Sequence, residues 1–208
     1  MNSRYLPAAG LAIVNSLVQL VGVLAFGWPI GNIFLLLWAE NVIITLVAIV
    51  RMAGVRDAPD GGAATKASTS FSLLFFCLVH GIFSGALAFM TGLDLTMTMF
   101  WAPLILLVIR YVVEVVGWYS RGERPATISE AHGFAMRRVV MLHVAIIACW
   151  TVMVLGLTRR DTLPEWLPSL PVLALTVLLV IKTIAEVYSM RLGPNAPTNW
   201  KFQARSRR

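Results

Sequence analysis

The chain has 208 residues, of which 58% are hydrophobic and only 13% are charged, and its mean hydropathy is +0.78. Soluble domains contain about 45–50% apolar and about 25% charged residues, so this composition excludes an ordinary soluble enzyme or binding module and indicates a polytopic membrane protein. The formal net charge of +7 would suggest nucleic-acid binding in a soluble protein. We attribute it instead to the basic residues that orient membrane helices, and we expect no nucleic-acid partner.

Six apolar segments are each long enough for a helix that crosses the core of a lipid bilayer, which takes about 20 residues. They cover about residues 7–26, 33–50, 70–91, 96–119, 137–157 and 170–190. We therefore predict an all-α polytopic membrane protein, a bundle of six transmembrane helices arranged as three antiparallel hairpins. Residues 1–208 form a single transmembrane domain in this interpretation, and residues 193–208 form its basic cytoplasmic tail.

The segments between the predicted helices carry signals for turns and for helix ends. Gly and Pro residues in 27–32 predict a tight turn, and residues 51–69 form a polar loop. Pro103 lies inside the fourth apolar segment and predicts a kink there. The sequence Thr-Ile-Ser-Glu at 127–130 matches a capping box, so we predict a helix start that either lies on the membrane surface or extends the fifth helix.

The distribution of basic residues predicts the orientation of the chain. Six spans place both termini on one side, and thirteen Lys and Arg residues fall on that side against two on the other. Because basic residues concentrate in cytoplasmic loops, we predict that both termini are cytoplasmic, in a bacterial inner membrane. The tail residues Lys201, Arg205, Arg207 and Arg208 either only set this orientation, which we favour, or also attract anionic lipid.

Five formally charged residues lie inside the apolar segments and away from their ends, namely Glu40, Arg110, Glu114, Lys182 and Glu186. One charge at the centre of a membrane helix costs about 2.5–3.5 kcal/mol on insertion scales. These side chains must therefore pair with one another or line a wet cavity, and we expect any functional site to lie among them. The spacing of Arg110 and Glu114, and of Lys182 and Glu186, predicts two ion pairs within single helices, which are either static or exchange partners during a functional cycle.

Glu40 has no basic residue one turn away in its own segment, so we expect it to pair across helices with Lys182 or Arg110. Its neighbour Asn41 points about 100° away from it on a helix. Counted from the basic residues that follow each segment, Glu40 lies about 9 Å deeper in the membrane than Glu186, at a rise of about 1.5 Å per residue. These distances predict that the two carboxylates lie at different levels.

The basic-x-x-x-Glu motif occurs twice, and the apolar segment before each copy contains a histidine, His80 or His143. This pattern suggests that the third and fourth segments and the fifth and sixth segments are copies of one unit. Neutral imidazoles relay protons or bind metals, although a buried histidine in a helix is more often a satisfied hydrogen-bonding residue. No Glu-x-x-His or His-x-x-x-His spacing is present, so we predict no metal and no cofactor, with His80, His143 and Glu40 as the weak metal candidates.

Small residues in the third segment predict close helix packing. Gly81-x-x-x-Gly85 favours packing within the bundle, in the interpretation we prefer, or between copies of the chain in a homo-oligomer. Cys77 and Cys149 both lie in apolar stretches, and we interpret them as reduced packing residues.

Four short motifs stand out along the chain: Leu-Trp-Ala-Glu40-Asn41-Val-Ile, Leu-Val-His80-Gly81-Ile-Phe, Met-Arg137-Arg138-Val-Val-Met-Leu-His143, and Lys182-Thr183-Ile-Ala-Glu186. Together they resemble an uncharacterised bacterial family of multi-pass membrane proteins, the domain of unknown function 6498, over most of the chain. That family often has a second histidine near the start of the third helix, where this chain has Ser70-Phe-Ser72, and an aspartate in place of Glu186. The resemblance implies the fold and the membrane location, and it implies no activity.

The function that the sequence favours is a small secondary transporter or an ion- or proton-coupled carrier. Its candidate ion-, proton- or substrate-binding residues are Glu40, Asn41, His80, Arg110, Glu114, His143, Lys182 and Glu186. The glutamates would bind the proton or cation, Arg110 and Lys182 would compensate their charge, and the histidines would relay or orient. Two alternatives stay open. The first is a membrane-embedded enzyme that acts on a lipid or quinone, with or without a metal, for which no catalytic residue is assigned. The second is an accessory or scaffold subunit.

Overall fold

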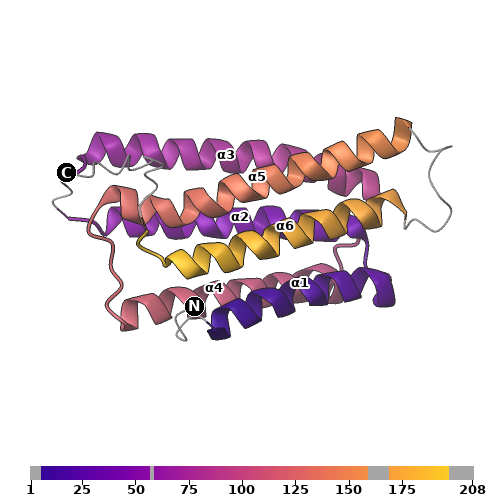
Figure 1. Cartoon of the computed structure of the whole chain (residues 1–208), viewed down its shortest axis with the longest axis horizontal. Helices are drawn as coiled ribbons and strands as arrows, with labels where there is room; N and C mark the ends of the chain where they lie inside the picture. The colour runs from indigo at the N-terminus through magenta and orange to yellow at the C-terminus, as the bar shows by residue number, and fades with distance from the viewer. Residues whose placement is uncertain (1–5, 57–58, 159–168, 197–208) are drawn as a thin grey trace, which may run out of the picture.

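The computed structural model describes residues 6–56, 59–158 and 169–196, and within them the chain is helical with no β-strand. Six α-helices alternate in direction along the bundle (Figure 1). Their bounds are α1 Leu6–Phe26, α2 Ile30–Ala53, α3 Ala63–Thr91, α4 Ala102–Ser120, α5 Ile128–Thr158 and α6 Leu170–Leu192, with a π-helical turn, η2, at Met97–Trp101. The predicted all-α class and the six helices are confirmed.

Five of these helices are long and apolar enough to cross a membrane. They are α2, α3, the continuous stretch of η2 and α4, α5, and α6. The apolar part of α1, Gly10–Phe26, is shorter, so the sixth span stays a prediction. Large apolar side chains such as Leu24, Phe71 and Phe89 are 62–84% exposed on the outside of the bundle. Such a surface is typical of contact with lipid, because a soluble monomer rarely exposes large contiguous apolar patches.

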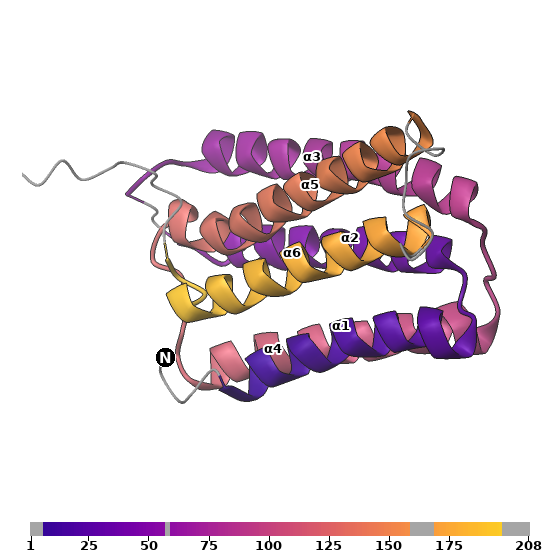
Figure 2. The same cartoon turned by 45° about the vertical axis from the view of Figure 1, so that its right-hand side comes forward.

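The helices do not pack as three hairpins in chain order. Of the three predicted hairpins, only the pair of α5 and α6 packs extensively. Helix α2 packs instead along α3 and α5, and α1 packs along α6. Figures 1 and 2 show α1 and α4 together on one side of the layer that α2, α5 and α6 form. Short turns between consecutive helices suggested the hairpins, but helix pairing depends on which faces carry small and polar residues, and those faces select other neighbours.

A close approach of two helix backbones explains the pairing of α2 with α3. A Cβ atom placed on Gly31 would meet the carbonyl oxygens of Ala88 and Gly92. Beside it, the Asn32 side chain donates to the carbonyls of Asp94 and Met99 and accepts from the Asp94 N–H at 3.0 Å. Glycine thus brings α2 against the end of α3, and asparagine fixes the turn that follows.

The small-residue stripe of α3 makes a close contact at only one of its two glycines. A Cβ on Gly81 would meet the Trp38 indole, whose Nε1 donates to the Cys77 carbonyl at 3.2 Å. Gly81 therefore serves packing within the bundle, as the favoured interpretation expects. A Cβ on Gly85 would meet no atom within 4 Å, so Gly85 takes no part in that contact.

Several helix ends lie outside the apolar segments. α3 begins at Ala63, ahead of the expected start near residue 70, and α5 begins at Ile128, well before 137. Pro103 lies in the first turn of α4, directly after the π-helical turn, and the kink at this position stays a prediction. Proline is tolerated in a first turn because the N–H that it lacks would have no partner in the helix there.

Two sets of hydrogen bonds cap the start of α5. The Glu130 N–H donates to Thr127 Oγ1 at 3.1 Å, and the Glu130 carboxylate accepts from the Ala126 N–H, one residue earlier than in the standard capping box. Asp60, in the loop before α3, accepts from the N–H groups of Ile128 and Ser129 at 3.0 and 2.8 Å. The capping box therefore predicted this helix start correctly. Of the two alternatives, the segment extends the fifth helix.

We predict that Gly31→Ala destabilises the protein by about 1–3 kcal/mol, because the added methyl group overpacks the contact between two backbones. Gly85→Ala is the matched control, since its methyl group enters open space and alanine is the better helix former by up to about 1 kcal/mol. Thermal unfolding of both variants in the same detergent measures the difference. Equal stability of the two variants would contradict the close approach of α2 and α3.

We predict that Asp60→Ala lowers stability by about 1 kcal/mol through loss of the α5 cap. Partial desolvation of Asp60 is outweighed by the Ser129 and Ile128 N–H groups, which hold its pKa below the usual value. The carboxylate therefore stabilises the fold above the pKa of the unfolded state, about 3.9, and this contribution is lost as the pH falls through the folded pKa. The difference between wild type and variant should be full at pH 6 and shrink below about pH 4.

Hydrogen exchange of the Ile128 and Ser129 amides checks this prediction locally. Both amides should exchange faster in Asp60→Ala, and in Asp60→Asn they should retain part of their protection because the amide side chain still offers one acceptor. Unchanged exchange of these amides in Asp60→Ala would show that the cap does not hold α5.

Candidate functional site

The charged residues inside the helices gather into one network. Lys182 Nζ lies 2.7 Å from Glu186 Oε1 and 3.0 Å from Glu40 Oε2. Arg110 contacts the other oxygens of the same carboxylates, Glu186 at 3.1 Å and Glu40 at 3.5 Å. Two carboxylates from α2 and α6 therefore share two cations from α4 and α6. The expected Lys182–Glu186 pair is present, and Glu40 pairs with both of the basic residues proposed for it.

Tyr111 and Arg138 extend this network to a third carboxylate. The Tyr111 hydroxyl donates to Glu40 Oε1 at 2.8 Å and accepts from Arg138 Nη1 at 3.1 Å. Arg138 Nη2 also donates to Glu114 Oε1 at 2.9 Å. The buried ion network, as we call these seven side chains, consists of Glu40, Arg110, Tyr111, Glu114, Arg138, Lys182 and Glu186. Its three acidic and three basic groups cancel in formal charge, which removes much of the cost of burying them.

The predicted pair within α4 is wrong. Arg110 and Glu114 lie one turn apart, but Arg110 pairs with Glu40 and Glu186, and Glu114 pairs with Arg138 of α5. Spacing along a helix places two side chains on one face. It does not determine whether they pair with each other or with residues of other helices. The two copies of the basic-x-x-x-Glu motif consequently differ, since only Lys182 and Glu186 pair within their helix.

The predicted difference in depth between Glu40 and Glu186 is also wrong. Both carboxylates contact the same Lys182 ammonium and therefore lie at one level. The estimate counted Arg51 as a residue at the membrane surface. Arg51 is in fact 2% exposed inside the bundle, stacks on Trp118 at 4.8 Å, and donates to the carbonyl of Pro194 after α6.

Arg138 and Tyr111 were missed by reasoning from the sequence. Arg138 counted as a basic residue outside the membrane because the fifth helix was expected to begin at 137. With the start at Ile128, Arg138 lies about 15 Å along the helix and is 3% exposed. The capping box at 127–130 was the signal that could have placed it. Tyr111 carries no charge, and nothing in its local sequence marks it.

A second group of buried polar side chains lies between α2, α3 and α5. The rings of His80 and His143 meet edge to face with centroids 5.1 Å apart. Contacts of Trp38 with Cys77 and Gly81 set the antiparallel register of α2 and α3, and place Asn41 level with the helical turn that carries His80. Among the described residues, both ring nitrogens of His80 and both polar atoms of the Asn41 side chain have no hydrogen-bond partner, although both residues are at most 1% exposed.

The contact of His143 with the backbone assigns one of its ring nitrogens. Nδ1 lies 2.8 Å from the Val139 carbonyl oxygen, so Nδ1 donates to it, and in the neutral ring Nε2 is then an acceptor. This acceptor and the free groups of His80 and Asn41 offer unused donors and acceptors in an apolar setting, where each costs about 1–3 kcal/mol.

The weak metal candidates do not come together in the described part of the chain. His80 and His143 lie side by side, whereas Glu40 is held by Lys182, Arg110 and Tyr111. Across residues 6–56, 59–158 and 169–196, no three His, Cys, Asp or Glu residues gather as a set that could hold a metal ion.

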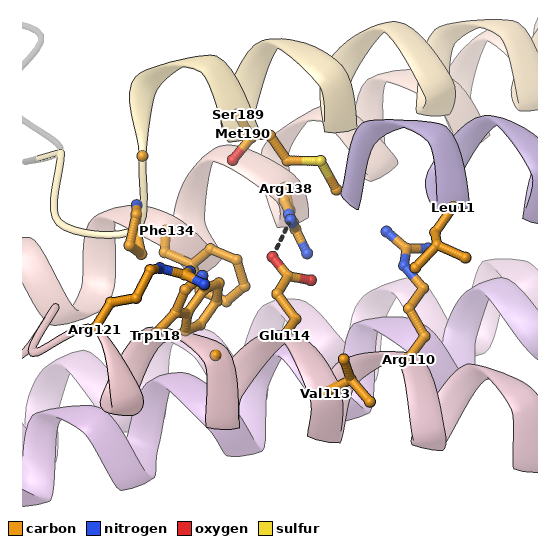
Figure 3. A pocket seen from close by; sticks show the side chains of 13 residues that line it. Leu11, Arg110, Val113, Glu114, Trp118, Arg121, Phe134, Arg138, Ser189 and Met190 are labelled. Atoms are coloured by element: carbon orange, nitrogen blue, oxygen red, sulfur yellow. Dashed lines mark hydrogen bonds and ion pairs between the residues drawn. The ribbon is translucent and has the colours of Figure 1, made fainter. Parts of the chain in front are cut away.

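A cavity of about 220 Å³ adjoins the ion network, with walls from α1, α4, α5 and α6 (Figure 3). Arg110, Glu114 and Arg138 line it, with Ser189 and Trp118 among the other residues around it. A second space of about 10 Å³ lies beside Lys182 and Glu186, with room for about one water molecule. The network thus adjoins one space that is large enough for a small ligand and one that has room for about one water molecule.

We predict that Glu114→Gln and Arg138→Gln each destabilise the protein by about 3–5 kcal/mol, because each leaves a buried charge without its partner. The double variant should cost less than the sum of the two by about 0.5–3 kcal/mol. Chemical unfolding in detergent measures all three values. A second double-mutant cycle, which combines Arg110→Gln with Glu114→Gln, is the matched control and should show weaker coupling because these residues do not pair. Stronger coupling in this second cycle would favour the pairing expected from the sequence.

Comparison with known proteins places the chain in a family without assigning an activity. The model of a family of unknown function, DUF6498, matches residues 2–205. No curated protein and no solved structure matches the chain significantly. The match covers the ion network, the His80–His143 pair and the described helices, in agreement with the resemblance of their motifs. The chain belongs to the DUF6498 family.

Proposed function

We propose that this membrane protein is a small secondary transporter of the bacterial inner membrane, coupled to a proton or another cation through the buried ion network. The observation that carries the proposal is that Glu40 and Glu186 share Lys182 and Arg110 across helices α2, α4 and α6. Intramembrane ionisable residues that face one another inside a bundle are typical of ion and proton pathways.

Charge balance supplies the coupling in this proposal. When one of the two carboxylates takes up a proton, Lys182 and Arg110 together carry one positive charge more than their partners. An unbalanced charge inside a membrane costs about 2.5–3.5 kcal/mol, which corresponds to roughly a hundredfold in a binding equilibrium. Protonation and the binding or release of a second ion therefore influence each other by that factor, and the influence is reciprocal.

The remaining candidate residues take supporting roles. Glu114 and Arg138 connect the network to the cavity, and Tyr111 passes a hydrogen bond between Arg138 and Glu40. His80, His143 and Asn41 relay protons or orient water, because their buried ring nitrogens and amide group have free hydrogen-bonding capacity. The unused capacity supports such a role better than it supports a metal site.

The basic residues at one end of the bundle support a proposed orientation. Lys66, Arg121 and Arg191 lie near the end where α2, α4 and α6 finish and α3 and α5 begin. In this proposal that end faces the cytoplasm, as basic residues favour. The cavity beside Glu114 and Arg121 then lies in the cytoplasmic half of the bundle.

We predict that purified protein in liposomes accumulates at least one small ion when a pH gradient is imposed, and that Glu40→Gln reduces this uptake at least tenfold. Glutamine has nearly the same shape as glutamate but does not take up the proton. Uptake of labelled sodium, phosphate and small carboxylates, with a pH-sensitive dye inside the vesicles, provides the measurement.

Glu130→Gln is the matched control, because glutamine keeps the acceptor that bonds the Ala126 N–H outside the network. It should transport like the wild type. If Glu40→Gln folds and transports like the wild type, or if no ion responds to the gradient, the carrier proposal is wrong and a scaffold role for the network is favoured.

A further inference from the structure

The 220 Å³ cavity reaches the outer surface of the bundle between α1 and α4. Leu11 and Val113 line it and are 53% and 60% exposed, so they form its mouth on the surface where apolar side chains face outward. Figure 3 shows the Arg110, Glu114 and Arg138 side chains directed into the space between α4 and α6. A ligand can therefore enter with its apolar part at the mouth and its polar part at the network.

The lining of this cavity is rich in hydrogen-bond donors. Three arginines line it, Arg110, Arg121 and Arg138, against one carboxylate, Glu114. Their charges are balanced by Glu40 and Glu186 behind Arg110, by Glu123 beside Arg121 and by Glu114 itself, so the cavity is not an isolated positive site. Its chemistry depends instead on which donors remain available.

Three buried donor atoms around the cavity have no hydrogen-bond partner in the described structure. They are Nε of Arg138, Oγ of Ser189 and Nη1 of Arg110, the last of which lies 3.5 Å from Glu40 without forming a hydrogen bond. Ser189 and Arg138 are both 3% exposed. Unused buried donors are costly, and an acceptor that carries negative charge forms the strongest hydrogen bonds with such donors.

The other walls of the cavity are apolar, with Trp118, Phe134 and Met190 on its inner side and Val113 at the mouth. A volume of about 220 Å³ is smaller than the roughly 300–1,000 Å³ of sites for drug-sized ligands. The ligand that fits this lining is a small molecule with one anionic head and a short apolar body.

We infer that this cavity is a binding site for a small amphipathic anion whose carboxylate or phosphate head meets Arg110, Arg138 and Ser189. The apolar body packs on Trp118 and leaves the cavity past Val113. The same chemistry is available from a free carboxylate in water and from the headgroup of an anionic lipid. Binding at this site does not require the carrier proposal to be correct.

Equilibrium dialysis of labelled octanoate against the purified protein in a nonionic detergent tests the inference, with protein-free micelles subtracted. We expect saturable binding of one octanoate per chain and at least tenfold weaker binding of the neutral analogue octanamide. Val113→Trp should weaken octanoate binding at least tenfold by filling the mouth. Val116→Trp, on the same helix and 61% exposed but outside the cavity lining, is the matched control and should bind like the wild type.

Ser189→Ala removes one donor without adding volume and should weaken octanoate binding several-fold, with thermal unfolding confirming that the variant is folded. The inference is overturned if octanoate binding is not saturable, if octanamide binds equally well, or if Val113→Trp and Val116→Trp bind alike. Because no gradient is applied, these outcomes are independent of the uptake experiment.

A second arm identifies the source of the anion. The protein is placed in nanodiscs of phosphatidylcholine with or without phosphatidylglycerol. Loss of octanoate binding when phosphatidylglycerol is present assigns the site to an anionic lipid, whereas undiminished binding assigns it to a soluble carboxylate. Either result supports the site and names its occupant.

Discussion

The Lys182 ammonium lies between two carboxylates, and the arrangement of three helices depends on this contact. Glu186 reaches it from the same helix and Glu40 reaches it from α2, while Arg110 of α4 contacts both carboxylates from another side. In an apolar bundle no single member of this group can be buried alone, because removing a partner from a buried ion pair costs about 3–5 kcal/mol. Charge neutrality therefore requires α2, α4 and α6 to meet at one level.

The same requirement explains how α4 is attached to the bundle. Its only buried residues are Leu107, Tyr111 and Trp118, so apolar packing alone gives it little hold. Arg110, Tyr111 and Glu114 connect it to α2, α5 and α6 through ion pairs and hydrogen bonds. A helix held mainly by exchangeable polar contacts is a suitable moving element, since a change in protonation changes the contacts that hold it.

Hydropathy was sufficient to predict the helices, because lipid and protein interior both demand apolar segments of spanning length. Spacing predicted the Lys182–Glu186 pair, and Arg110 and Lys182 were the predicted partners of Glu40 because they were the basic residues counted inside the membrane. The pairing of Glu114 with Arg138 was beyond such reasoning, because it depends on how α5 packs near α4. Helix order in space was equally out of reach, since the contact of Gly31 with Ala88 and Gly92 is invisible in local sequence.

The proposed anion site and the proposed proton site share Arg110, Glu114 and Arg138, and this overlap links them physically. An anion that accepts a hydrogen bond from Arg138 Nε leaves the Nη2 bond to Glu114 in place, so two negative charges lie on one guanidinium and repel each other. Protonation of Glu114 removes that repulsion, so it strengthens anion binding, and anion binding in turn favours protonation by the same factor. Coupling of a proton to an anion then needs no distant signal, because one arginine serves both partners.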